Sequence, residues 1–422
     1  MLPFSSFPSL ADAFFQPLAD LVPGLPHQRS APALSDGVWL FQGISRVLEN
    51  EPSGRAFLQK AASSPLPVPT HSNFFAALAS KRRLRFCQGA NESLARFMAR
   101  TLPDPFKEFP ALKDFDLHAG DGHFHAAAVH DPRDQESGTK YATGHVYLMD
   151  LRTQGLRHLD LCDPVERIKE HDLRLIKRKG AEALRCAAPT GRKVIIAWDR
   201  AMIDFKWWQA AKDQRGLYFV TRPKSNTQLT MSGFHGYDAA DAVNAGVISD
   251  EEGAPAATGR VIRRITWRDP LTGETWQFLT NEMTLAPGLI VLIYRRRWDI
   301  EKVYDEFKNK FHEKKSWASS PAAKSTQAAF LCLTHNLTVL LDHSLAEAGM
   351  KNSAGIKRRE KRLEEQTAAA TKAGRVMPLI ISGFQRLTQR SVKLIRWLRQ
   401  NLWSPRPLRD LWAILTELYR TS

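Results

Sequence analysis

The chain has 422 residues, and its 60 Lys and Arg against 44 Asp and Glu give a formal net charge of +16, which favours a polyanionic partner, either nucleic acid or an anionic membrane. Its 43% hydrophobic and 25% charged residues form an ordinary globular mixture, which excludes a wholly disordered chain. No apolar run approaches the ~18–20 residues of a membrane span, and four scattered cysteines without a CxxC pair argue against a disulfide framework or a zinc ribbon.

The first part of the chain, residues 1–110, is expected to be helical. The pattern then changes to three short strands, in the segments DFDLHAGDG, HVYLMDLRT and LRHLDLCD. A charged helix over 164–179 follows, and then the continuous apolar strand KVIIAWD at 193–199, which is typical of a central strand. A helix closed by Gly216 and the strand LYFVTRP complete the series. This order predicts an α/β region with a mixed sheet over 111–225.

The second half of the chain is expected to hold three regions. Residues 226–288 are net acidic and read as a β-rich insertion with two strands, RVIRRITW and ETWQFL, joined by the turn DPLTG. Helices resume over 289–345. The region 346–422 is expected to be helical and basic, because residues 351–422 hold 16 basic and 5 acidic residues, or +11 of the total charge.

Two aspartates follow predicted strands. Asp199 ends the apolar strand KVIIAWD, and catalytic acids collect at strand ends in α/β sheets. A charge there is costly unless it is paired or binds metal; an equally weighted interpretation makes Asp199 the N-cap of the next helix. Asp121 stands in HAGDGHFH, where a plain turn residue is the competing interpretation.

A third acid lies in the helical stretch IYRRRWDIEKVYDEFKNKF. On a regular helix Tyr294, Arg297, Glu301 and Lys308 fall within about 60° of one another. Ile300, Val303, Phe307 and Phe311 form a separate apolar face that would pack on the sheet. The competing interpretation is an amphipathic helix with a solvated Arg297–Glu301 ion pair.

Taken together, Asp121, Asp199 and Glu301 can hold two divalent metal ions for in-line phosphoryl transfer. Carboxylate and water ligands suit Mg²⁺ or Mn²⁺.

At this point the sequence resembles a family. The spacing from Tyr294 through Arg297 and Glu301 to Lys308 is similar to the Tyr-Arg-Glu-Lys signature of DDE insertion-sequence transposases, the IS-four group. The segment WDRAMIDFKWWQAAKDQRGLYFVTRPKSN resembles the block around the second Asp of that family. AGDGHF resembles the block around the first, with His123 where Thr is commoner.

The resemblance covers about 110–345 and implies a ribonuclease-H-like mixed sheet flanked by helices, with a β-rich insertion over 226–288. It implies Asp121, Asp199 and Glu301 as catalytic ligands of two Mg²⁺ (or Mn²⁺) ions. It also implies that Tyr294 and Arg297 handle the DNA end and that Lys308 contacts its backbone. The implied reaction is cleavage at transposon ends followed by joining to target DNA, with double-stranded DNA as partner and a homodimer on it.

Several further features bear on DNA contact. Arg222 and Lys224 follow a strand near the expected site and favour phosphate contact, and residues 1–110 are expected to bind the DNA end. Trp267 and Trp276 are interpreted as core of the insertion rather than as base-stacking residues, and Trp298 as a packing residue. The histidines His118, His123, His125 and His130 fit no standard zinc spacing, which leaves a zinc site as a minor alternative.

The tail contains an expected basic amphipathic helix. Its apolar positions are Leu387, Leu394, Ile395, Leu398 and Leu402, and its basic positions are Arg386, Arg390, Lys393 and Arg396. We expect this helix to add sequence-independent DNA affinity, with a dimer contact as an alternative for its apolar face.

Two other functions remain open from the sequence. One is a nuclease of the same fold that does not join strands, and the other is a non-catalytic DNA-binding protein derived from a transposase. No basic region precedes the apolar residues of MLPFSSFPSLADAFF, so no signal peptide is expected. The expected location is the bacterial cytoplasm, in association with the nucleoid.

Overall fold

A computed structural model describes residues 7–25, 34–49, 51, 53–62, 68–162, 164–165, 168–186, 188–270, 272–350, 353–374 and 392–420. Its N-terminal elements are α1 (Leu10–Ala19), η2 (Val22–Gly24), α2 (Asp36–Glu49), α3 (Gly54–Ala61), α4 (His71–Leu78), α5 (Lys81–Thr101) and η3 (Pro110–Leu112). The central elements are β1 (Phe115–His125), β2 (Thr143–Asp150), β3 (Leu156–Leu161), β4 (Pro164–Val165), β5 (Ile168–Lys169), α6 (Asp172–Leu184), β6 (Lys193–Trp198), η4 (Arg200–Met202), α7 (Phe205–Arg215) and β7 (Leu217–Thr221).

Four further strands precede the helices of the second half. These strands are β8 (Leu229–Phe234), β9 (Val247–Pro255), β10 (Ile262–Arg268) and β11 (Thr275–Thr280), with η5 (Ala242–Asn244) between β8 and β9. The helices are α8 (Pro287–Arg296), α9 (Asp299–Asp305), the π-helix η6 (Glu306–Lys310), α10 (Pro321–Glu347), α11 (Ser353–Lys372), α13 (Val392–Asn401) and α14 (Leu408–Arg420).

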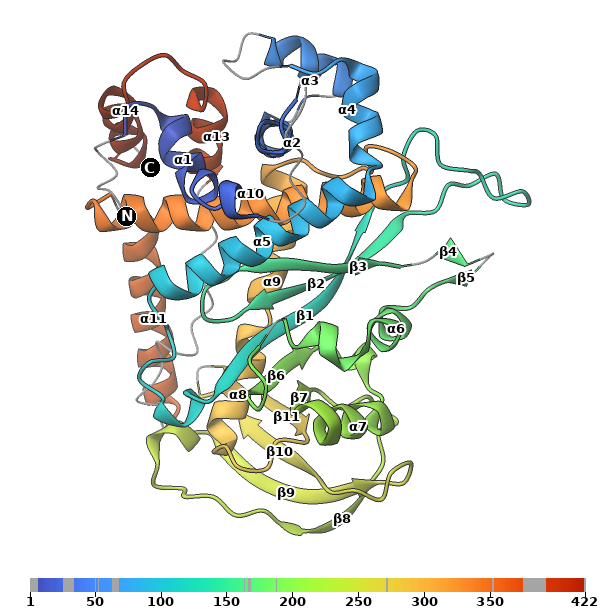
Figure 1. Cartoon of the computed structure of the whole chain (residues 1–422). Helices are drawn as coiled ribbons and strands as arrows, with labels where there is room; N and C mark the ends of the chain where they lie inside the picture. Colours follow the sequence, from blue (N-terminus) through green and yellow to red (C-terminus); the bar gives the residue numbers. More distant parts are fainter. Residues whose placement is uncertain are drawn as a thin grey trace.

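One large mixed sheet organises the molecule (Figure 1). Its nine strands run in the order β3-β2-β1-β6-β7-β11-β10-β9-β8. Strands β1, β6 and β7 are parallel, and the remaining neighbours are antiparallel. The predicted mixed sheet flanked by helices is confirmed.

The apolar sequence of β6 is explained by burial on both sheet faces. Ile195 and Ala197 join the core under α5, α9 and α10, whereas Val194, Ile196 and Trp198 join a second core under α6 and α7. The neighbouring strand carries glycine where the Trp198 ring presses on it, since a Cβ at Gly120 would lie 2.2 Å from that ring. The predicted central strand is confirmed, and Gly216, at φ 60°, ends α7 as expected.

Two local predictions were wrong. The helix expected over 164–179 begins at Asp172, because residues 164–165 and 168–169 pair as the short strands β4 and β5, and His171 caps the helix. The segment 226–288 holds four strands where we expected two. Strands β8 and β9 were missed because LTMSGF is polar and VISDEEGAP carries adjacent acids, so neither shows apolar alternation.

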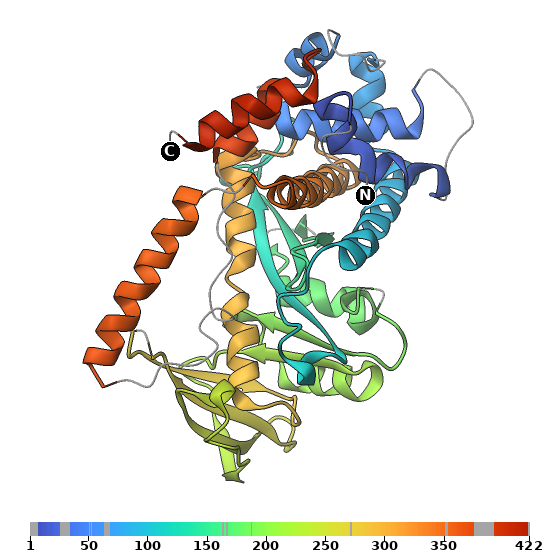
Figure 2. The same cartoon turned by 90° about the vertical axis from the view of Figure 1, so that its left-hand side faces the viewer.

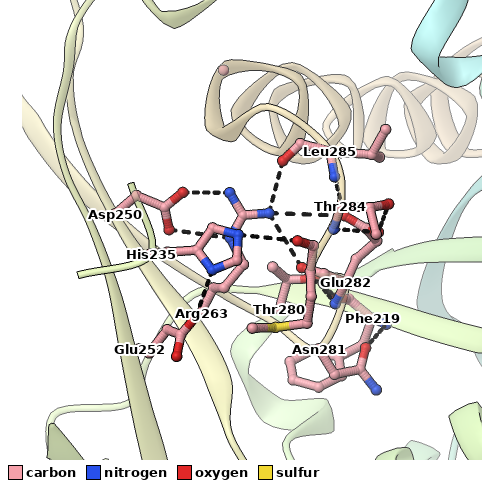
Figure 3. A network of polar contacts seen from close by, with 12 residues as sticks. Phe219, His235, Asp250, Glu252, Arg263, Thr280, Asn281, Glu282, Thr284 and Leu285 are labelled. Atoms are coloured by element: carbon pink, nitrogen blue, oxygen red, sulfur yellow. Dashed lines mark hydrogen bonds and ion pairs between the residues drawn. The ribbon is translucent and has the colours of Figure 1, made fainter. Parts of the chain in front are cut away.

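These four strands continue the main sheet through the β7–β11 pairing. A buried group of ionic side chains, Arg263, Asp250 and Glu282, joins them to the start of α8; we call it the Arg263 cluster (Figure 3). Arg263 forms an ion pair with Asp250 through two contacts and donates to the carbonyl of Leu285 at 2.7 Å. The second part of the chain is thereby anchored next to the column of α8, α9 and η6 (Figure 2).

The N-terminal and C-terminal helices gather around α10 (Figure 1). α10 is 27 residues long and is buried along most of its length, including polar residues such as Gln327, His335 and Asn336. Helix α11 stands beside the body (Figure 2), and most of its described side chains are exposed. The described residues of both end regions contain the helices α1–α5 and α11, α13 and α14.

Candidate functional site

Asp121 lies on β1, on the face covered by α9. Strand alternation places Asp121, His123 and His125 on the same face, and the His123 ring stacks on Tyr304 of α9 with 4.6 Å between ring centroids. The Tyr304 hydroxyl donates to the main-chain oxygen of Asp121 at 2.9 Å. Asp121 is therefore held in a regular strand under the helix that carries Glu301, and it is not a plain turn residue.

Asp199 lies beside Asp121 because β1 and β6 are parallel neighbours. Their register pairs Gly120 with Trp198, so Asp199, just after the end of β6, lies level with Asp121, which is within the longer strand β1. One carboxylate oxygen of Asp199 accepts from the backbone of Ala201 and caps η4. Asp199 is thus an N-cap, as one interpretation proposed, but it caps the short 3₁₀ helix η4. Asp204 caps the following α-helix, α7.

Glu301 approaches Asp121 from α9, and Arg297 lies between the two carboxylates. The guanidinium contacts Asp121 at 3.5 Å and Glu301 at 3.1 Å. The side chains of Asp121 and Glu301 are 22% and 39% exposed, and that of Arg297 is 6% exposed. The Arg297–Glu301 ion pair that we considered as a purely structural feature thus exists, and Arg297 extends it to Asp121.

The pKa shifts of Asp121 and Arg297 are those expected when three acids lie close together. Burial raises the pKa of Asp121 to about 6; Arg297 opposes this rise, and the charges of Asp199 and Glu301 add to it. Burial also opposes the charge of Arg297, but Tyr294, Asp121 and Glu301 outweigh it, so the pKa of Arg297 is raised. We call Asp121, Asp199 and Glu301 the carboxylate cluster.

The carboxylate cluster is not a preformed metal cage. Among the residues that the structure describes, no group of three or more His, Cys, Asp or Glu side chains is arranged to hold a metal ion. The physical reason lies in the hydrogen bonds, because Arg297 and the capped backbone already take carboxylate oxygens. The oxygen-only donor set still fits Mg²⁺ or Mn²⁺ chemically.

The predicted DNA-contacting residues fall into two groups. Tyr294 is buried against Phe278, and Arg297 lies over its ring at 5.6 Å. Arg222 is close enough to influence the pKa of Tyr294, which burial raises. Lys308 and Lys224 are exposed, and Lys224 lies in the loop after β7. The structure brings Tyr294 and Arg297 to the carboxylate cluster and Arg222 near Tyr294, whereas no contact among the described residues joins Lys224 to that cluster.

The single regular helix expected over Tyr294 to Lys308 is interrupted twice. A turn at 297–298 separates α8 from α9, and the π-helix η6 holds Lys308. Ile300, Val303, Phe307 and Phe311 are all buried as expected. Trp298 is partly buried and lies against Arg297.

The tryptophans of the insertion differ. Trp267 is buried, as expected for a core residue. Trp276 is partly exposed, and Arg222 lies over its ring at 4.8 Å.

A row of buried histidines adjoins the carboxylate cluster. His123, His125, His145 and His158 lie in succession, and His145 and His158 are 3.0 Å apart at their ring nitrogens. Burial lowers the pKa of His125 to about 3 and that of His123 to about 4. His118 is buried and His130 is exposed. The described part of the chain forms no zinc site with them.

Sequence reasoning missed Tyr304, His145 and His158. Tyr304 follows Glu301 by three residues and so shares its helix face, which is a signal that could have identified it. The two histidines lie on β2 and β3, and only the strand register brings them to this region.

The basic tail helix proved to be part of the core. Leu394, Ile395, Leu398 and Leu402 are buried, and Arg399 donates to the carbonyl of Leu48. Leu387, Arg386 and Arg390 lie outside the described residues. The apolar face of this helix is thus covered by the chain itself, so the alternative of a dimer contact there was wrong.

None of the described helices is long and apolar enough to cross a membrane.

Comparisons with known proteins agree with this geometry. A protein of Sinorhizobium fredii (strain NBRC 101917 / NGR234) described as "Putative transposase y4zB" is 30% identical over 128 residues, which cover 28% of this chain and 35% of that protein. The chain thus matches about a third of the length of this relative. Residues 130–337 match the family model "Transposase DDE domain". This range contains Asp199, Arg297 and Glu301 and begins after Asp121. The similarities support a DDE transposase domain in the central part of the chain.

Proposed function

We propose that the protein is a DNA transposase that cleaves transposon ends and joins them to target DNA. The observation that carries the proposal is the convergence of Asp121, Asp199 and Glu301 from two adjacent parallel strands and the helix packed over them. The family match to residues 130–337 supports the same function.

Asp121, Asp199 and Glu301 would hold two Mg²⁺ (or Mn²⁺) ions. When bound, such ions activate the attacking oxygen and neutralise the leaving oxygen of an in-line transfer. Arg297 would release carboxylate oxygens to the metal and turn toward a DNA phosphate, for which its planar donors are suited. Tyr294, Arg222, Lys224 and Lys308 would contact the DNA end and its backbone, and a homodimer would assemble on the DNA.

Further parts of the proposal concern the fold and the setting. We infer a ribonuclease-H-like core over 111–225 and 289–345, a β-rich insertion over 226–288, an end-binding region over 1–110 and a basic region over 346–422. The three antiparallel strands β3-β2-β1 followed by parallel β6 and β7 support the core assignment. The protein would act at the nucleoid in the bacterial cytoplasm.

The test uses duplexes that carry the inverted repeats flanking the gene, with Mg²⁺ and a supercoiled target plasmid. Cleavage at the ends and joining to the plasmid are expected. Cleavage without joining would overturn the strand-transfer step and favour the nuclease.

A non-catalytic DNA-binding protein is the second candidate, because Arg297 fills the space between two of the carboxylates. Absence of any metal-stimulated cleavage by a well-folded protein that binds the ends would favour it.

A further inference from the structure

The basic run at the start of α5 divides into two pairs of side chains. Arg82 turns inward and holds Asp36 at 2.6 and 2.7 Å, and Arg83 contacts the same carboxylate at 3.4 Å. Lys81 and Arg85 are exposed and form no ion pair with any residue in the described ranges. Since Lys81 and Arg85 are four residues apart, they share one face of the helix.

Lys81 and Arg85 line a hollow of about 470 Å³, which we call the basic hollow. Its other walls come from β3 with Asp160, from α6 with Arg178, and from the first turns of α10 with Pro321 and Ser325. Four elements that are distant in the sequence therefore meet there. A shared hollow of this kind is a better binding surface than a row of charges on one helix.

The charge of the basic hollow is positive and only partly compensated. Its one acid, Asp160, is already paired with Arg178 at 3.1 Å and with Lys179 at 3.4 Å. Arg178 also holds Glu170 at 2.9 Å. Because these acids are neutralised within the wall, the charges of Lys81 and Arg85 remain available to an anion.

The position of the basic hollow relative to the carboxylate cluster follows from the strand register. Gly122, next to Asp121, pairs with Val146 on β2, and Val146 pairs with Asp160 on β3. Two strand spacings separate the backbones of Asp121 and Asp160 by about 10 Å. Lys81 and Arg85 line the hollow together with Asp160, so roughly 10–15 Å separates them from the carboxylates. At 3.4 Å of helix axis per base pair, this distance corresponds to about three to four base pairs of duplex.

We propose that the basic hollow binds the phosphodiester backbone of the DNA duplex, about three to four nucleotides from the phosphate that is cleaved. Lys81 and Arg85 supply the phosphate contacts, and Arg178 forms the rigid wall between them and the sheet. The contact is independent of base sequence, since ammonium and guanidinium groups here meet phosphates and no base edge. This inference rests on the proposed function for the identity of its ligand.

The experiment compares a Lys81→Gln/Arg85→Gln variant with a control, Arg96→Gln/Arg100→Gln, which removes two exposed charges further along α5. Binding of an end duplex is measured by fluorescence anisotropy at several salt concentrations without divalent metal. The first variant should bind about tenfold more weakly, and its plot of log K against log salt should be shallower by about 1.8, or 0.9 for each lost contact. The control should stay close to the wild type. Thermal unfolding checks that both variants are folded.

A second arm locates the contact along the DNA. Single neutral methylphosphonates are placed at each position near the cleaved phosphate. Methylphosphonates about three to four nucleotides away should weaken binding by the wild type but should not weaken it further in the Lys81→Gln/Arg85→Gln variant. Equal losses for the two double variants, or additive losses at every phosphate position, would overturn the proposal.

The measurement separates this proposal from the proposed function. Binding is measured without divalent metal and so does not depend on cleavage. A protein that binds the duplex through Lys81 and Arg85 but does not cleave it once Mg²⁺ is added would refute the transposase function and leave the basic hollow intact. Normal cleavage together with unchanged DNA binding by the Lys81→Gln/Arg85→Gln variant would refute the basic hollow and leave the transposase function intact.

Discussion

Arg263 and Arg297 each lie between two carboxylates, but their surroundings differ. In the Arg263 cluster, the side chains of Arg263, Asp250 and Glu282 are 0–1% exposed, and Arg263 meets Asp250 through two contacts (Figure 3). In the carboxylate cluster, Arg297 makes single contacts at 3.1 and 3.5 Å with partly exposed acids. We infer that the Arg263 cluster is a permanent structural contact, whereas in the carboxylate cluster another cation can replace Arg297.

The hydrogen bonds around each cluster explain the difference. Glu282 accepts from the backbone of Thr284 at 2.8 Å and from that of Leu285 at 2.7 Å, so both of its carboxylate oxygens are hydrogen-bonded. Asp121 accepts only a neighbouring backbone N–H at 2.9 Å besides the long contact with Arg297, and burial raises its pKa to about 6. An acid that is buried and under-compensated attracts a further cation.

The largest expected effect separates the two clusters by activity. Asp121→Asn or Glu301→Gln should lower Mg²⁺-dependent end cleavage by at least about a thousandfold, because several kcal/mol of charge stabilisation are lost. Asp213→Asn, which removes an exposed carboxylate on α7, serves as control. Gel assays of end cleavage provide the measurement, and substantial cleavage by the Glu301 variant would refute its role.

The next effect compares the two arginines by stability. Arg263→Met should lower the free energy of unfolding by about 3–5 kcal/mol, because it leaves buried carboxylates unpaired. Arg297→Met should cost about 1 kcal/mol or less, since its partners are partly exposed. Urea unfolding without metal measures both free energies. Equal losses in the two variants would contradict the distinction between a structural Arg263 cluster and an exchangeable carboxylate cluster.

Asp121→Asn should make the protein more stable while abolishing its activity. The folded-state pKa of Asp121, about 6, lies above its ordinary value of 3.8, so ionisation in the folded state costs free energy. The gain on substitution should be about 1–3 kcal/mol above pH 6, should shrink as the pH falls from 6 to 4, and should vanish below about pH 4. Unfolding curves from pH 3.5 to 8 test this. Asp250→Asn, which removes the buried partner of Arg263, should instead destabilise the protein.

The smallest effect concerns metal binding without DNA. Mg²⁺ at ten times its dissociation constant should add about 1.4 kcal/mol and raise the melting temperature by roughly 1–2 °C. The Asp121→Asn variant should show no such rise. Differential scanning calorimetry measures the shift, and an equal rise in both proteins would place the ion elsewhere.

The sheet could be predicted from the sequence wherever burial follows a simple period. The strand of Ile195 and Ala197 is apolar throughout because both of its faces are covered. Strand β9 escaped prediction because its acids Asp250 and Glu251 are paired with Arg263 and Arg264 across the sheet. Local sequence holds no sign of such a partner.

The candidate site was predictable in its residues but not in its arrangement. The spacing from Arg297 to Glu301 predicts that both lie on one helix face, and they do form an ion pair. That Arg297 also reaches Asp121, 176 positions away in the chain, depends on how α9 packs on β1. The basic hollow likewise requires α5, β3, α6 and α10 to meet, so no single segment of the sequence reveals it.

The π-helix after α9 has a consequence for the length of related chains. In η6 the backbone N–H of Phe311 bonds to the carbonyl of Glu306, five residues earlier, at 2.9 Å. A π-turn contains one residue more than an α-turn at the same place. Deletion of Asn309, which is exposed, should therefore convert this turn to an α-helix, with Phe307 and Phe311 still buried. Homologues are expected to vary by one residue here, while the interval between Arg297 and Glu301 stays constant.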